Sequence, residues 1–434
     1  MKQRYHRAEQ QLAWHWQSKL EGGVNVQAPK DSHHTFFTQA NNLWSSCVAS
    51  QKEEQLTTDG EMHYGYGTYP DFITKGIFGD QALPPALVQS PNGRYLAVQR
   101  IDERSVADIP LMQSVPKGAQ VRPVDHRYKL ALPGDQYLPL ASLVVIDLQT
   151  KTGVVIDREP LPASNGGLVE AERVFWDSQN QLYAIEHSRD HRALSVVTID
   201  PVTGKSRVLL EELDSSHIYS GPVPFSAPVV KVLEDRGEII GYSHSSGWGH
   251  LSLYDINTGE LKNAITAGNY VVTALKCVDN AKGQLYFTAC GKEPDRNPYY
   301  EHLYRINLDA SDLVLLTPED AQHDINPFSA DDNQFIDTFS RVDLPSRQVV
   351  RRSADGGIIK VILETDDAQT SATGFNHPVM FTAQADDNET DLFGVMYRPS
   401  NFDKANVYPV ILAIYGTPHE CIVPLRYAET SDKV

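Results

Sequence analysis

A short apolar segment that ends in Asp and is followed by a Thr-Gly turn recurs along the chain. The copies are 144–147 before Thr152-Gly153, 197–200 before Thr203-Gly204, 253–255 before Thr258-Gly259, and a weaker one at 304–307. The anchor positions 147, 200, 255 and 307 are separated by 53, 55 and 52 residues. A period of this size, built from strands and turns, is typical of the blades of a β-propeller.

A second pattern alternates with the first, in which a polar turn precedes a short apolar strand. Its copies are 90–93 before 95–98, 178–180 before 182–185, 235–237 before 239–242, 281–283 before 285–288, and 329–332 before 335–336. Each unit therefore has a hairpin turn and, later, a strand closed by the Asp-containing turn. One such unit cannot bury both faces of its sheet, so the units must pack in a ring. The sequence predicts a mainly β protein with a seven- or eight-bladed propeller.

Three regions interrupt the rhythm. Residues 1–30 include a short helical pattern, and the stretch between 98 and 143 holds five prolines and reads as a long irregular excursion. From His377 on, apolar segments follow at 378–382, 392–397 and 409–415, and the last is a continuous run typical of a strand buried on both faces. We expect an N-terminal segment at 1–30, a propeller at 31–376 and the start of an α/β domain at 377–434.

Composition narrows the possible partners and the compartment. The net charge of −18 over 434 residues disfavours nucleic acid and anionic membranes as partners. The sequence has no apolar stretch long enough for a membrane span and no apolar segment after its charged N-terminus, so we expect a cytoplasmic protein without a signal peptide. Four cysteines are scattered without metal-ligand spacing, which predicts free buried thiols and no metal site.

Several longer segments resemble a known family over essentially the whole chain. They are Arg7-Ala8-Glu9, 90–97 (SPNGRYLA), 247–255 (GWGHLSLYD), 339–345 (FSRVDLP), 397–403 (YRPSNFD) and 408–411 (YPVI). The chain resembles the dipeptidyl peptidase IV branch of the prolyl oligopeptidase superfamily of serine peptidases. The resemblance implies the N-terminal propeller of that family, with only the first strands of its α/β-hydrolase domain from His377 to Val423.

The resemblance also implies an activity and its location. The family cleaves peptides, usually after a penultimate proline or small residue, with a Ser-Asp-His triad on the hydrolase domain, while the propeller acts as a lid and funnel. In the family the triad follows the strands at the end of this chain. We therefore expect this chain to lack nucleophile, acid and base, to need no cofactor, and to be inactive alone.

One catalytic residue of the family has a counterpart here. A tyrosine in a Tyr-x-Gly-Pro turn stabilises the oxyanion, because a preorganised donor is aimed at the developing charge. The matching phrase is Tyr415-Gly416-Thr417-Pro418, in which Thr417 replaces the second glycine. By resemblance, Tyr415 would be the only catalytic residue in the chain. The alternative is a tyrosine at a strand end that packs against the propeller.

The family's specificity motif is altered. Dipeptidyl peptidases hold the substrate's amino group with glutamates in an Asp-Trp-x-x-Glu-Glu segment, because a buried ammonium needs opposite charge. Here the segment begins at Asp71, the candidate substrate-binding residue, but Lys75 and Gly76 stand where the glutamates belong. A lysine would repel the ammonium, so we do not expect dipeptide exopeptidase action.

Other candidate residues favour structural interpretations. Ser243 lies in an elbow-like phrase that lacks the second glycine and falls on a blade strand, so it is not expected to be a nucleophile. His187 and His191 are four apart, but the residues between them indicate a turn and therefore surface histidines. The pairs Glu53-Glu54 and Glu211-Glu212 are expected at solvated sheet edges.

Two functional classes remain open. On the first, the chain is the propeller portion of a peptidase, and its partners are a peptide substrate or a separately encoded catalytic domain. On the second, it is a standalone propeller that binds a peptide or protein without catalysis. A broken-off apolar sheet edge is an aggregation hazard, which favours the first class. The sequence leaves the oligomeric state open.

Overall fold

The computed structural model describes most of the chain. The described residues are 34–77, 83–116, 122–163, 167–169, 172–214, 217–222, 228–329, 331–368, 372, 376–415 and 421–427. The expected N-terminal segment 1–30 lies outside them. Two compact units are present, and each is described by itself: Met1–Ser220 with Phe225–Pro228 and Ile256–Gly259, and Gly221–Pro224 with Val229–Asp255 and Glu260–Val434.

Unit 1 holds three antiparallel sheets, one separate hairpin and a short π-helix, η1 (Phe72–Ile77). The first sheet contains β1 (His34–Gln39), β2 (Asn42–Cys47) and β3 (Glu53–Gln55). The second contains β4 (Tyr64–Tyr66), β5 (Leu87–Gln89), β6 (Tyr95–Asp102), β9 (Leu140–Asp147), β10 (Thr152–Val155) and β11 (Leu161–Pro162). The third contains β12 (Val174–Trp176), β13 (Leu182–His187), β14 (Ala193–Ile199) and β15 (Ser206–Leu213). The hairpin pairs β7 (Asp108–Gln113) with β8 (Val124–Lys129), so the stretch expected to be irregular contains a regular two-stranded element.

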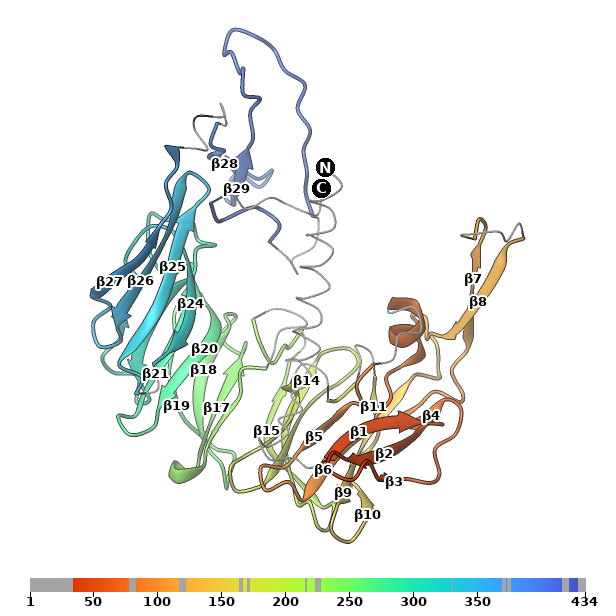
Figure 1. Ribbon diagram of the computed structural model, residues 1–434. Coiled ribbons are helices and arrows are strands. Elements are labelled where there is room, and N and C mark those ends of the chain that lie inside the picture. Colours follow the sequence, from red (N-terminus) through yellow and green to blue (C-terminus); the bar gives the residue numbers. More distant parts are fainter. Residues whose placement is uncertain are drawn as a thin grey trace. The chain divides into compact units, whose positions relative to one another are not determined.

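Unit 2 holds three four-stranded sheets, which lie next to one another in Figure 1, and one further hairpin. The first contains β16 (Lys231–Leu233), β17 (Glu238–Ser243), β18 (His250–Asp255) and β19 (Leu261–Ala264). The second contains β20 (Val271–Asp279), β21 (Gln284–Cys290), β22 (His302–Asn307) and β23 (Val314–Leu315). The third contains β24 (Gln322–Phe328), β25 (Gln334–Arg341), β26 (Leu344–Arg352) and β27 (Ile358–Glu364). A 3-10 turn (Glu234–Arg236) separates β16 from β17, and β28 (Val379–Gln384) pairs with β29 (Asp391–Met396).

The two recurring patterns occupy the turns that the sequence predicts. The polar turns lie between the first and second strands of a sheet, as between β12 and β13 or β24 and β25. The Asp-containing turns lie between the third and fourth strands, as between β14 and β15. There Asp200 Oδ1 accepts the amides of Val202 at 2.8 Å and Thr203 at 3.3 Å. The described residues supply six of the seven or eight expected blades.

Glycine in these turns permits a close approach to the preceding sheet. Gly204 has φ +71°, and a Cβ placed on it would lie 2.8 Å from the carbonyl oxygen of Val155. Gly356, in the turn between β26 and β27, has φ +73° and would place a Cβ 2.1 Å from the carbonyl oxygen of Leu316. A side chain fits neither the backbone conformation nor the space. The first copy differs, because there Lys151 adopts the positive φ (59°) instead of Gly153.

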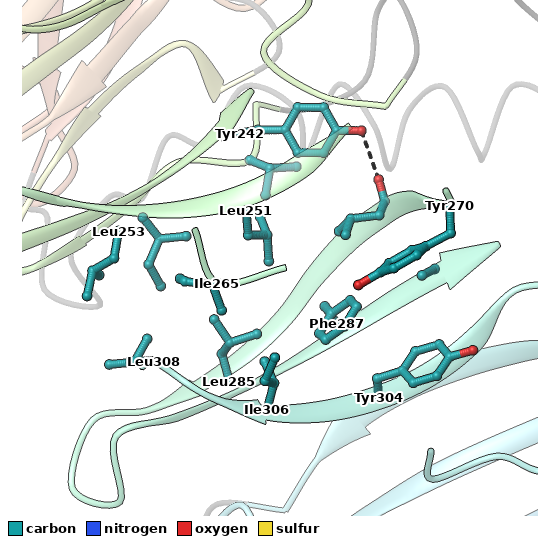
Figure 2. Packing of buried hydrophobic residues seen from close by; sticks show 14 of the residues in the cluster. Tyr242, Leu251, Leu253, Ile265, Tyr270, Leu285, Phe287, Tyr304, Ile306 and Leu308 are labelled. Atoms are coloured by element: carbon teal, nitrogen blue, oxygen red, sulfur yellow. Dashed lines mark hydrogen bonds between the residues drawn. The ribbon is translucent and has the colours of Figure 1, made fainter. Parts of the chain in front are cut away.

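The core of unit 2 is built from alternate positions on neighbouring strands. Figure 2 shows Leu251 and Leu253 of β18 and Leu285 and Phe287 of β21 among the packed side chains. Residues two apart on a strand point to the same face, so this spacing directs them all into one apolar layer between two sheets. The buried hydroxyl of Tyr242 donates to the carbonyl of Val272 at 2.9 Å, which satisfies the polar end of its ring.

The expected strand at 409–415 is absent. This segment is not a strand, and among the residues that the structure describes it pairs with no other segment. Val410, Ile411 and Leu412 are 86%, 90% and 77% exposed. A strand buried on both faces needs a neighbour along each edge and cover over each face, and the described residues supply neither. The expected segments at 378–382 and 392–397 do form strands, β28 and β29.

Among the described residues, no helix combines the length and the apolar character that crossing a membrane requires.

The contact at Gly356 can be tested against a matched glycine. Gly247 also has a positive φ (+85°), but a Cβ placed there meets no atom within 4 Å. G247A should therefore lower the free energy of unfolding by about 1 kcal/mol, because alanine only has to adopt the left-handed backbone conformation. G356A should lower it by about 2–4 kcal/mol, because the added Cβ also clashes with the backbone. Urea unfolding of both variants measures the difference. Equal losses would show that the approach to Leu316 is not a constraint.

Candidate functional site

The segment that resembles the specificity motif begins a short helix. The amide of Asp71, which precedes η1, donates to both carboxylate oxygens of Glu103, at 2.9 and 3.2 Å. The amides of Ile73 and Thr74 donate to the carbonyl of Pro70 at 2.9 and 3.2 Å. Glu103, which follows β6 and is only 3% exposed, thus fixes the start of the helix.

The carboxylate of Asp71 is also engaged within the chain. Its Oδ2 accepts the backbone amide of Lys129 at 3.1 Å, which ties the helix to β8. The ammonium of Lys129 turns elsewhere, to the carbonyl of Val106 at 2.7 Å and to Asp108 at 3.2 Å. The contacts therefore give Asp71 a positioning role, and binding of a substrate by Asp71 stays a prediction.

A histidine joins these two carboxylates. His63 lies in a tight turn before β4 with φ +63°, an uncommon backbone conformation for a residue with a side chain. Its carbonyl accepts the amide of Glu103 at 2.8 Å, and its Nδ1 lies 3.9 Å from Asp71 Oδ2. The donor atoms of His63, Asp71 and Glu103 all lie within 4.8 Å of one another. Sequence reasoning missed this group because its members have no local spacing in common.

A second cluster of similar residues lies in the sheet β24–β27. Arg351 donates from Nε to Asp337 at 2.8 Å and from Nη2 to Glu319 at 2.7 Å. His323 Nδ1 faces Asp337 at 3.0 Å, and its Nε2 faces the Glu319 carbonyl at 3.1 Å. Both ring nitrogens of His323 therefore face oxygen atoms of the cluster. The guanidinium already supplies the cation, which makes this a closed ion network that stabilises the fold.

Arg351 and its neighbour Arg352 offer a direct test of that network. R351A should destabilise the protein by about 3–5 kcal/mol because it strands the fully buried Asp337. Arg352 pairs with Asp355 at 2.7 Å in an exposed ion pair, so R352A should cost less than about 1 kcal/mol. Urea unfolding at neutral pH measures both values. A loss below about 1 kcal/mol for R351A would contradict the assigned role.

The turn predicted between His187 and His191 is present, with the amide of His191 donating to the carbonyl of Ser188 at 3.1 Å, but both histidines are half-buried and not on the surface as predicted. His187 ends β13, and its Nε2 lies 3.2 Å from the Ser220 hydroxyl. Its ring centroid is 5.7 Å from that of His191, which in turn stacks on His217 at 6.1 Å. Burial lowers the pKa of His187 to about 3, so the ring is neutral at pH 7. The histidines are half-buried because the distant segment 217–220 packs against them.

Ser243 is buried on β17, opposite His250 of β18. A general base would have to point at the serine oxygen. Instead, the His250 ring nitrogens face the Thr266 hydroxyl at 3.0 Å and the Gly268 carbonyl at 2.9 Å. The Ser243 hydroxyl bonds to that of Ser245 at 3.0 Å. These contacts favour a structural role for Ser243.

The remaining candidates fall in different places. Tyr415 is 52% exposed at the end of the unpaired apolar run, and the turn after it, 416–418, lies outside the described residues. Its role at an oxyanion stays a prediction. The two glutamate pairs lie on the edge strands β3 and β15, as predicted, and Glu54 forms an ion pair with Lys151 at 2.5 Å.

All four cysteines are free, but they are not uniformly buried. Burial raises the pKa of Cys277 to about 12 and that of Cys290 to about 11, so both thiols are protonated at pH 7 and unreactive. Cys47, Cys277 and Cys290 are half-buried and Cys421 is exposed, which corrects the expectation that the thiols are buried.

Comparisons with known proteins find one family and several longer relatives that are similar to this chain. Residues 14–346 match the family described as "Dipeptidyl peptidase IV (DPP IV) N-terminal region". A "Probable dipeptidyl-aminopeptidase B" of Coccidioides posadasii (strain C735) is 25% identical over 426 residues, covering 94% of this chain and 45% of the relative. A protein of the same name from Tuber melanosporum (strain Mel28) is 27% identical over 385 residues, covering 84% of this chain and 41% of the relative. The chain thus spans about half the length of the curated relatives it matches.

A solved structure gives the same result for the fold. The crystal structure of Porphyromonas gingivalis dipeptidyl peptidase 4 superposes with a TM-score of 0.71 at 21% sequence identity. The match covers 92% of this chain and 54% of that protein. The two proteins therefore share a fold over the part of this chain that holds the described sheets.

Proposed function

Because the chain belongs to the dipeptidyl peptidase IV N-terminal region family, we propose that it is the propeller portion of a serine peptidase that cleaves peptides. The propeller limits access of substrates to catalytic residues on a hydrolase domain. The observation that carries this proposal is the exposed apolar run at 409–415, which follows the blade sheets and to which the described residues offer none of the neighbours that a buried strand needs.

Contacts between the blade sheets and the segments before this run support the proposal. The hydroxyl of Tyr300, in the loop before β22, bonds to the sulfur of Met380 on β28 at 3.1 Å. The ring of Tyr299 packs edge-on against Phe393 of β29 at 6.0 Å. The loop before β22 thus anchors the hairpin β28–β29, which precedes the apolar run in the sequence.

We also propose that the catalytic Ser-Asp-His residues lie outside residues 1–434. The orientation of His250 away from Ser243 supports this for the most elbow-like serine of the sequence. Relatives of about twice the length leave room for a catalytic domain beyond the matched part.

A fluorophosphonate probe, which labels activated serines, tests the position of the nucleophile. We expect the purified chain to remain unlabelled, and S243A to behave identically, because the ring nitrogens of His250, which lies opposite Ser243, face Thr266 and Gly268. Labelling of the chain that disappears in S243A would contradict the proposal.

Intact mass measurement of the protein from its native cells is the companion test. A single species of 48.4 kDa would favour the alternative, a standalone binding propeller.

The altered specificity motif supports another proposal, namely that the propeller does not select peptides by their free amino terminus. Lys75 and Gly76 lie within η1, where the family's glutamates would hold an ammonium. Titration of the chain with an Ala-Pro-containing peptide and its N-acetylated form should give equal affinities. A preference for the free amine of tenfold or more, about 1.4 kcal/mol, would contradict this. K75E is the informative variant, because it should create such a preference if the segment faces the substrate.

A further inference from the structure

We propose that His63, Asp71 and Glu103 form a binding site for a divalent transition-metal cation, and that Zn²⁺ is the ion that suits their donor set. The inference does not depend on the proposed peptidase function. The three side chains come from the turn before β4, the start of η1 and the residue after β6. Imidazole nitrogen and carboxylate oxygen are both zinc ligands in proteins.

The spacing of the donor atoms suits a single ion. All three lie within 4.8 Å of one another, and His63 Nδ1 is 3.9 Å from Asp71 Oδ2. Tetrahedral zinc binds nitrogen and oxygen at about 2.0–2.2 Å, which places its ligand atoms roughly 3.3–3.6 Å apart. Side-chain movements of about 1 Å or less therefore complete the site.

The existing hydrogen bonds orient the carboxylates. Glu103 accepts the amide of Asp71, and Asp71 accepts the amide of Lys129. Each carboxylate oxygen has two lone pairs, so an amide donor on one of them does not prevent coordination through another. Contacts of this kind around a metal site hold ligands in place and strengthen binding.

The charges favour a cation at this position. Glu103 is 3% exposed and the Asp71 side chain 14%, so two carboxylates approach each other with little solvent. Like charges in such surroundings repel strongly, and a divalent ion between them removes the repulsion. Two nearby cations bind other groups: Lys129 pairs with Asp108, and Arg104 pairs with Asp102 and Glu61.

Access and ligand number indicate the type of ion. His63 is 24% exposed at its side chain, which gives an ion a path from solvent. Three protein ligands leave a fourth tetrahedral position for water. Calcium prefers six to eight oxygen ligands, so this set suits zinc better. A bound ion would join the helix, visible as the coil near β8 in Figure 1, to the end of β6.

Calorimetric titration of the chelator-treated full chain with ZnCl₂ tests the site. We expect one Zn²⁺ per chain, with affinity at least tenfold weaker in H63A and in E103Q. E103Q keeps an amide oxygen that can accept the Asp71 amide, so it removes charge while preserving the helix start. H126A is the matched control, because His126 is exposed on β8 and bonds only to Gln113 among the described partners. Its affinity should equal that of the unaltered chain.

Absorption spectra with Co²⁺ provide a second readout that reports coordination directly. The unaltered chain should give the visible bands of a four-coordinate ion, and H63A should not. Zinc affinity unchanged in both H63A and E103Q would overturn the proposal, as would absence of binding. Binding lost in H187A but retained in H63A would place the ion at the other histidine cluster and would equally overturn it. Thermal melting of each metal-free variant shows whether that variant is folded. If E103Q does not fold, the zinc affinity of H63A alone decides the test.

Discussion

The sheet β20–β23 has two apolar faces, one packed against β16–β19 and the other against β24–β27, and neither can be buried within the sheet itself. The layer shared by the sheets β16–β19 and β20–β23, with Leu253 and Leu285 on facing strands, is the solution to this constraint. The constraint also explains the period of the sequence. A unit must supply four strands, the three turns that join them and a connection to the next unit before the same interface can recur. Where the described chain supplies no next layer, as at 409–415, apolar side chains remain in solvent.

Two groups of His, Asp and Glu show how one neighbour changes the chemistry of the same residue types. In the sheet β24–β27, Arg351 lies between Asp337 and Glu319 and closes the network. Beside η1, the corresponding contacts come from neutral backbone amides, of Asp71 and Lys129. Amides orient carboxylates without neutralising them. The first group therefore contains a cation of the chain itself, bound to both of its carboxylates.

The sequence predicts what depends on neighbouring residues and misses what depends on distant ones. The positions of Asp200 and Gly204 identify their turn because each acts on its own backbone, through a side-chain acceptor and a positive φ. The burial of His187 could not be predicted because it comes from residues 217–220, which lie far from His187 in the sequence. The group at His63 and Glu103 could not be foreseen for the same reason, since an αL turn brings together residues 40 positions apart. The run at 409–415 has the composition of a buried strand, but composition cannot create the missing neighbours.

The close approach of Gly356 to Leu316 has a consequence for how such a chain diverges. The glycine meets a carbonyl oxygen, which every residue type carries, so the side chain at position 316 is irrelevant to that contact. At this contact the spacing between the two sheets is set by backbone atoms, so a change of side chain at 316 needs no compensating change at position 356. Repeated units can then drift apart in sequence while keeping a common geometry, provided that the turn keeps a residue tolerant of positive φ. A fold assembled in this way retains its form long after its units cease to look alike.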